Sequence, residues 1–130
     1  MNQPARQSKR KAYFWGQSAE WLCIGVLFLK GYRILARRFK CKVGEIDLIA
    51  QKGQVICFVE VKARRDRRDA LEAVSFHQQQ RIMRAAEWYL TKNCSTEHGN
   101  ILKMSYRFDV MAVEPWRWPT HVKDAWQKKT

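Results

Sequence analysis

Two segments rich in Val, Ile and Phe, residues 44–51 and 54–63, flank the dipeptide Lys52-Gly53, and they constrain the fold of this chain more than any other feature. Two apolar, β-branched runs separated by a two-residue turn that contains glycine predict a β-hairpin. With this turn, Glu45 is expected opposite Glu60. A three-residue turn or a bulge would instead move the side chains of one strand to the other face.

Acidic side chains gather on one face of this hairpin. Because side chains alternate across a strand, Glu45 and Asp47 are expected on the same side as Glu60 and Lys62. Asp47 then becomes the diagonal neighbour of Glu60, at about 7–8 Å between backbones. Carboxylates this close repel unless a cation lies between them, and Mg²⁺ or Mn²⁺ would relieve the repulsion. A solvated face of Glu and Lys pairs is the alternative, but apolar neighbours favour a half-buried metal site.

The other elements follow from apolar periodicity, and their order predicts one α/β domain with a mixed central sheet flanked by helices. A basic arm at 1–14 and a tail at 116–130 are expected to flank a domain at 15–115. Ser75 and Gln78 match a helix capping box. The expected elements are a helix at 17–30, strands at 32–40, 44–51 and 54–63, a charged loop at 66–69, a helix at 75–92 and a strand at 104–113.

The chain carries 25 Lys and Arg against 12 Asp and Glu, a net charge of +13. Such a charge favours a polyanionic partner, because each phosphate that is neutralised releases counterions. Four arginines that directly follow the hairpin are expected to contact nucleic-acid phosphates: Arg64, Arg65, Arg67 and Arg68. A basic adaptor that docks on acidic proteins or anionic membranes is an alternative function, but this function would not explain the acidic residues of the hairpin.

Glu20 lies on the same helical stripe as Cys23 and Leu27, where an acidic side chain is unexpected because the stripe is apolar. Its carboxylate either interacts with the positive N-terminal end of the helix dipole or reaches the metal site. Cysteine usage predicts reduced thiols in a cytoplasmic protein, because the four cysteines, Cys23, Cys41, Cys57 and Cys94, form no C-x-x-C pair. The apolar run at 21–29 is far shorter than the roughly 20 residues of a membrane span, so no membrane association is expected.

Five sequence blocks resemble the YraN-like family of uncharacterised bacterial proteins. The blocks are Ala19-Glu20, Gly31-Tyr32, Gly44-Glu45-Ile46-Asp47-Leu48-Ile49, Phe58-Val59-Glu60-Val61-Lys62 and Arg107-Phe108-Asp109-Val110. That family is related to the archaeal Holliday-junction resolvases and, by fold, to the PD-(D/E)xK nucleases. The resemblance therefore implies a restriction-endonuclease-like fold. It departs at Gln78, where the family commonly has a lysine, and in the loop 65–70, which lacks the family's frequent glycine.

The resemblance implies that Asp47 is the first acid of the motif, that Glu60 and Lys62 form its E-x-K, and that Glu20 is an auxiliary catalytic acid. Asp47 and Glu60 would hold Mg²⁺ or Mn²⁺, and Glu45 would either join them or hold Lys62. The expected function is metal-dependent hydrolysis of DNA phosphodiester bonds, with branched DNA as one expected substrate. A non-catalytic nucleic-acid-binding module is the alternative, and the resolvase analogy makes a homodimer an expectation.

Two further groups of residues are expected to have structural roles. Arg107 and Asp109 alternate with apolar residues and are expected to form an ion pair at the sheet edge. Three tryptophans of the tail, Trp116, Trp118 and Trp126, could stack on bases, but at least one of them is expected to cover the sheet.

Overall fold

The computed structural model describes residues 18–93 and 104–128, so the arm at 1–14 and Cys94 lie outside the described residues. A helix at residues 18–29, called helix 1 below, precedes the first strand. The remaining elements are β1 (Arg33–Cys41), β2 (Gly44–Lys52), β3 (Val55–Ala63), α2 (Arg67–Glu72), α3 (Phe76–Lys92), β4 (Ser105–Val113) and β5 (Thr120–Trp126).

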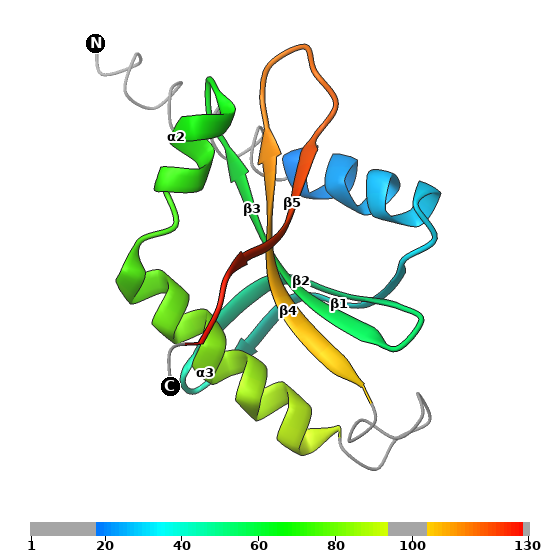
Figure 1. Cartoon of the computed structure of the whole chain (residues 1–130), viewed down its shortest axis with the longest axis vertical. Helices are drawn as coiled ribbons and strands as arrows, with labels where there is room; N and C mark the ends of the chain where they lie inside the picture. Colours follow the sequence, from blue (N-terminus) through cyan, green and yellow to red (C-terminus); the bar gives the residue numbers. More distant parts are fainter. Residues whose placement is uncertain (1–17, 94–103, 129–130) are drawn as a thin grey trace, which may run out of the picture.

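The five strands form one mixed sheet in the order β1-β2-β3-β4-β5, in which β3 and β4 are parallel and the other neighbours are antiparallel. Helix 1 lies on one side of the sheet and α3 on the other (Figure 1). The expected α/β class with a mixed sheet is therefore confirmed. The crossover through α2 and α3 returns the chain to β4 beside β3, as a parallel pair requires.

Two segments differ from the expected element order. Residues 66–69, expected as a loop, instead open α2, because the Asp66 side chain caps its first turn by accepting a hydrogen bond from the amide of Asp69 at 2.9 Å. The expected tail contains β5, which pairs with β4 along the sheet edge. Trp126 at the end of β5 is buried and stacks on Phe108 with 5.3 Å between ring centroids, so one tail tryptophan does cover the sheet.

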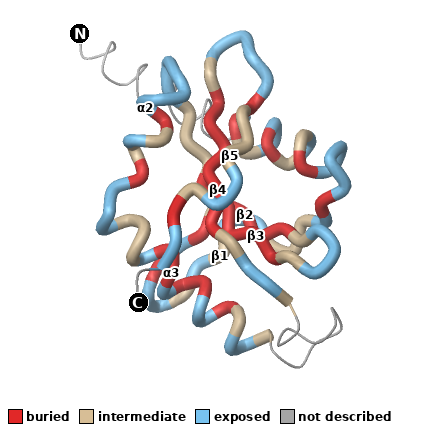
Figure 2. The backbone as a smooth tube through the Cα atoms, in the orientation of Figure 1, coloured by how far each residue is buried: buried red, intermediate tan, exposed pale blue. Residues whose placement is uncertain are grey.

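The sheet separates two apolar cores (Figure 2). On one face Ile49, Ile56 and Phe58 pack against α3, and on the other Leu48 and Val59 pack against helix 1. Because both faces are covered, the central residues of the two strands, 48–50 in β2 and 55–59 in β3, are all apolar. Glu60, which follows directly on the second of these stretches, is buried.

The hairpin forms as expected, but its register is two residues away from the expected one. The turn residues are Gly53 and Gln54, so Lys52 pairs with Val55. Gly53 has φ +59°, which a glycine adopts without strain. The predicted pairing of Glu45 with Glu60 is wrong. The side chains of β3 keep their predicted faces, because a shift of two residues leaves alternation unchanged. In β2 the alternation breaks, because Ile46 and Ile49 both lie in the core under α3, so Glu45 is not on the predicted face.

A close contact places α3 against β2. At Gly44 an added Cβ would lie 2.7 Å from the carbonyl oxygen of Arg81, so only glycine lets the helix backbone approach this strand. Ser75 caps the start of α3, where its side chain accepts a hydrogen bond from the amide of Gln78 at 3.1 Å. These two features fix where the first turn of α3 lies over the sheet.

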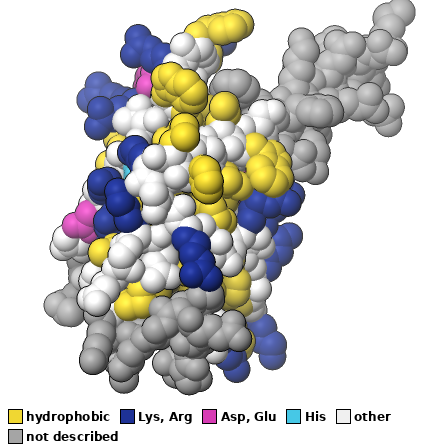
Figure 3. All heavy atoms as spheres, turned by 90° about the vertical axis from the view of Figure 1, so that its right-hand side faces the viewer, with side chains coloured by type: hydrophobic (Ala, Val, Ile, Leu, Met, Phe, Trp, Pro, Cys, Tyr) yellow, Lys and Arg dark blue, Asp and Glu magenta, His cyan; other side chains and the backbone are white. Residues whose placement is uncertain are grey.

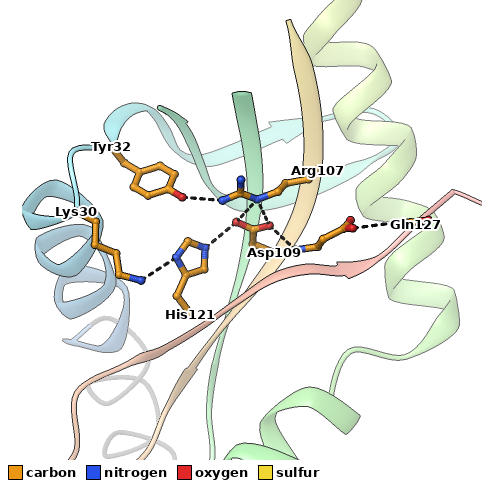
Figure 4. Close-up of polar contacts among 7 residues, drawn as sticks. Lys30, Tyr32, Arg107, Asp109, His121 and Gln127 are labelled. Carbon is orange, nitrogen blue, oxygen red and sulfur yellow. Dashed lines mark hydrogen bonds and ion pairs between the residues drawn. The ribbon is translucent and has the colours of Figure 1, made fainter. Parts of the chain in front are cut away.

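A buried polar network ties β5 to β4 and to the end of helix 1 (Figure 4). The fully buried Asp109 carboxylate accepts hydrogen bonds from Arg107 Nε at 2.9 Å and from the backbone amide of Asp124 at 3.0 Å, and it lies 2.7 Å from His121 Nε2. Arg107 also donates to the Tyr32 hydroxyl at 2.7 Å. The predicted ion pair of Arg107 and Asp109 is thus confirmed, within a larger network.

Burial alone would raise the pKa of Asp109. The hydrogen bonds from His121, Arg107 and the amide of Asp124 outweigh that effect and hold its pKa below the ordinary value. An acid whose pKa is lowered in the folded state adds stability above its ordinary pKa, and this stability is lost as the pH falls through the lowered pKa.

Asp109→Ala should reduce the free energy of unfolding by about 3–5 kcal/mol, because it leaves the half-buried Arg107 guanidinium and the buried His121 ring without their carboxylate. The control is Glu87→Ala, which breaks the exposed pair with Lys128 and should cost less than about 1 kcal/mol. Urea titration at pH 7 measures the free energy of unfolding of both variants. The difference between the Asp109 variant and the wild type should become smaller as the pH is lowered. Equal losses in the two variants would contradict the structural role of the network.

Candidate metal and nucleic-acid site

The backbone ladder of the hairpin ends at Leu48 and Val59, and the next residues along the two strands are Asp47 and Glu60. Beyond that point the Asp47 side chain replaces a backbone acceptor, because its Oδ2 accepts a hydrogen bond from the Val61 amide at 2.9 Å. The carboxylate is therefore fixed to the β3 backbone beside Glu60. The two acids converge as the sequence predicts, although as immediate neighbours of the last pair and not as diagonal partners.

Glu60 is only 5% exposed and lies between three polar side chains. Gln78 of α3 donates from Nε2 to Glu60 Oε1 at 3.1 Å, and Lys62 Nζ lies 3.7 Å from the same oxygen. Burial first, and then the neighbouring Asp47 carboxylate, raise the pKa of Glu60 to about 9 despite the opposing effect of Lys62. Burial and the Asp47 charge therefore both favour the protonated form of Glu60 when no cation is bound.

Glu20 lies on helix 1. Burial, with the nearby charges of Asp47 and Glu20, raises the pKa of the Cys23 thiol to about 12. The Glu20 carboxylate accepts a hydrogen bond from Arg38 Nε at 3.0 Å. The structure therefore pairs Glu20 with a guanidinium and describes no contact between Glu20 and Asp47 or Glu60.

Glu45 does not join the acids in this structure. It is exposed, and it pairs with Lys40 of β1 across the sheet. The reason is the observed register, which separates Glu45 from Glu60 by two more positions than the turn predicted.

The four arginines predicted to contact nucleic acid, Arg64, Arg65, Arg67 and Arg68, are all exposed. They lie two to six residues after Lys62 in the sequence, and the last two belong to α2. Arg68 also lies 3.6 Å from Glu72 in a solvent-exposed pair, which costs little to break. The group is exposed and therefore accessible to a large polyanion.

The donor set fits a hard divalent cation in part. Within residues 18–93 and 104–128 no group of three or more His, Cys, Asp or Glu side chains lies close enough to hold a metal ion. Asp47 and Glu60 nevertheless offer two adjacent carboxylates in a largely buried position, where a cation would replace the proton that Glu60 holds. A site with two protein carboxylates suits Mg²⁺, which retains several water ligands.

Two residues that contact the acids were not predicted to do so. Gln78 was expected to complete the helix cap, but its side chain turns to Glu60. Arg38 was read only as part of a strand, yet it has φ +53° and pairs with Glu20. The positive φ of Arg38 could not be predicted from the sequence pattern. The contact of Gln78 was easier to anticipate, because the capping motif already placed this residue in the first turn of a helix.

Comparisons with known proteins agree on one family. Residues 19–113 match the model of the uncharacterised protein family UPF0102. The chain belongs to the UPF0102 family. It is 49% identical over 118 residues to a UPF0102 protein of Mesorhizobium japonicum, covering 91% of this chain and 90% of that one. It is also 48% identical to a UPF0102 protein of a Chelativorans species, covering 95% and 96%.

The resemblance noted in the sequence is confirmed, because UPF0102 is the YraN family. The matched region begins just before Glu20 and ends with β4, so it includes both acids of the hairpin and the arginines that follow. β5 lies beyond the matched residues. Within the part of the chain that is described, no helix combines the length and apolar character needed to cross a membrane.

Glu60→Gln should stabilise the metal-free protein at pH 8 by at least about 1 kcal/mol, since the amide replaces a carboxyl group whose raised pKa costs folding energy once the unfolded chain can ionise. The raised pKa adds stability below the ordinary value of 4.5, and that stability is lost as the pH rises toward about 9. The gain should therefore shrink toward pH 5 in denaturant titrations with EDTA.

Glu45→Gln is the matched control, because it removes the same charge from an exposed position and should change stability by less than about 0.5 kcal/mol at either pH. A Glu60→Gln protein that is less stable than the wild type at pH 8 would show that Glu60 is not strained by its neighbours.

Proposed function

We propose that this UPF0102 protein is a metal-dependent endonuclease that hydrolyses phosphodiester bonds in DNA, and that its α/β domain is restriction-endonuclease-like. One observation carries the proposal. Asp47 and Glu60 converge at the end of the hairpin, and Lys62 Nζ lies 3.7 Å from Glu60 on the same strand. Two adjacent carboxylates beside a lysine supply what phosphodiester hydrolysis needs, a metal site and a group that positions water.

Asp47 and Glu60 would bind Mg²⁺ or Mn²⁺ between them. The bound ion would lower the pKa of a water molecule and offset the charge that builds on the phosphate. Lys62 would orient the attacking water and, as an ammonium, help its deprotonation by stabilising the hydroxide, and Gln78 would hold the Glu60 carboxylate in place. Glu20 would act from helix 1 as an auxiliary acid, which requires release of its contact with Arg38. Glu45 would serve only if β2 shifted.

Nucleic acid is the expected substrate because the chain has a net charge of +13 and exposes four arginines next to the acids. These guanidinium groups would bind backbone phosphates, which sets position and carries no sequence preference. Branched DNA is the proposed substrate class, by analogy with the resolvases that the sequence blocks resemble.

A non-catalytic nucleic-acid-binding module is the second candidate, and two observations favour it. Glu20 is paired with Arg38, and Gln78 stands where the resembling family commonly has a lysine. A fold can keep metal ligands while serving only in binding. The experiment below separates the two candidates.

Purified protein should cleave at least one of linear duplex, single-stranded, flap and four-way-junction DNA in the presence of Mg²⁺ or Mn²⁺, and none in EDTA. Lys62→Ala should lower the cleavage rate at least about 100-fold, since positioned proton transfer contributes about 10²–10⁴-fold. DNA affinity should change little, because one ammonium hardly alters the field of so basic a protein. Gel analysis of end-labelled substrates measures the rate.

Glu45→Gln serves as the control that should retain cleavage. Cleavage that survives unchanged in both Lys62→Ala and Asp47→Ala would identify a contaminating nuclease. Tight, metal-independent binding of every substrate without cleavage would favour the binding module.

Replacing Arg64, Arg65, Arg67 and Arg68 together by Ala should flatten the salt dependence of DNA binding, because log K falls with log salt in proportion to the phosphates contacted. The control removes four exposed cations of the β1 region, Arg33, Arg37, Lys40 and Lys42, and thus the same total charge. Fluorescence anisotropy between 50 and 300 mM salt, roughly the range over which such contacts weaken, gives both slopes. An unchanged slope in the first variant would exclude these arginines as the contact surface.

A further inference from the structure

Helix 1 has two apolar faces, and among the described residues only one of them packs into a core, although Arg37 lies over the Trp21 ring at 4.6 Å on the other. Ala19, Cys23 and Leu27 are buried against the sheet. The opposite face exposes four large apolar side chains: Trp21 is 57% exposed, Leu22 43%, Phe28 73% and Leu29 79%. A soluble domain seldom leaves so much apolar surface together without a partner.

Figure 3 shows the side of the molecule on which helix 1 lies in Figure 1, and on that side exposed hydrophobic side chains are interspersed with Lys and Arg. We define this outer apolar face by Trp21, Leu22, Gly25, Phe28 and Leu29. The spacing of its members repeats at three and four residues, so they form one continuous stripe along the helix.

The stripe is symmetric about Gly25. Trp21 and Leu22 precede it by four and three residues, and Phe28 and Leu29 follow it by three and four. Two such helices that cross antiparallel at Gly25 would therefore bring Trp21 of each copy against Leu29 of the other, and Leu22 against Phe28. A two-fold interface requires this kind of self-complementary surface.

Gly25 supplies the close approach at the centre. It is exposed, and an added Cβ would meet nothing within 4 Å, so the fold of one chain gives no reason for glycine here. Glycine within a helix costs about 1 kcal/mol relative to alanine. A helix crossing explains the cost, because a residue without a side chain lets two backbones come together.

The available area suffices for a stable association. Taking 150–250 Å² for each large side chain, the exposed fractions of the four apolar residues amount to roughly 500 Å² per copy. Two copies would bury about 1,000 Å² from these side chains alone, which reaches the lower bound for specific interfaces. Residues around the crossing would add to this area.

We propose that a second copy of this chain docks on the outer apolar face, through an antiparallel crossing of the two helices at residues 18–29 centred on Gly25. The interface is independent of the proposed nuclease activity, since none of the five residues belongs to the acid site. It assigns to helix 1 a second role, in assembly.

Sedimentation equilibrium of the full-length protein should show a dimer at micromolar concentration. Phe28→Asp should weaken dimerisation at least tenfold, because it places a charge inside the interface. Phe76→Asp is the matched control: Phe76 is also an exposed phenylalanine, at 69%, but it lies on α3 and its replacement should leave the dimer intact. Circular dichroism checks that both variants fold.

Cysteine cross-linking tests the geometry. Gly25→Cys should form a disulfide-linked dimer under mild oxidation, whereas Trp21→Cys and Leu29→Cys should cross-link efficiently only when the two proteins are mixed. The unmodified protein, with its native cysteines, gives the background.

Several results would overturn the proposal. A monomer at all concentrations would exclude a second copy as the occupant of this face. Dimers that persist in Phe28→Asp would place the interface elsewhere. Binding of the monomer to anionic phosphatidylserine vesicles, lost in Phe28→Asp, would identify a lipid surface as the partner.

Discussion

The hydrogen bond from the Val61 amide to Asp47 is the contact on which the candidate site depends. The backbone ladder of β2 and β3 stops one residue earlier, and a carboxylate takes the place of the next carbonyl. This exchange fixes Asp47 beside Glu60, and burial together with the Asp47 charge raises the pKa of Glu60. Proteins tolerate such an unfavourable arrangement where the surrounding structure fixes it, and here the two covered faces of the sheet do so.

The sequence predicted that Asp47 and Glu60 converge, although the register it implied was wrong by two residues. The two acids still meet, because they follow directly on the last paired residues of the hairpin, Leu48 and Val59. A shift of two leaves β3 on its predicted faces, because strand alternation has a period of two. In β2 the alternation breaks between Ile46 and Ile49, which both lie in the core under α3, so Glu45 lost both its predicted partner and its predicted face.

Contacts between segments that are distant in the sequence could not be predicted from local sequence patterns. β5 follows two prolines and lies at a sheet edge, so neither its apolar content nor its turn signals predicted it. His121 is held by Asp109, a residue twelve positions earlier on another strand. Gln78 satisfies a local capping pattern with its backbone while its side chain reaches Glu60, and a capping motif describes only the first of these roles.

Helix 1 connects the candidate site with the proposed assembly. Glu20 lies five residues before Gly25, which is about 7.5 Å along a helix that rises 1.5 Å per residue. In an antiparallel crossing the two copies of Glu20 would therefore lie about 15 Å apart along the helix direction, on opposite sides of the two-fold axis. Under the proposed nuclease function, a two-fold pair of acid sites would match the pseudo-two-fold symmetry of duplex or four-way DNA, whose strands run in opposite directions. Each copy would then meet one strand in the same orientation, which a monomer with one site could not achieve.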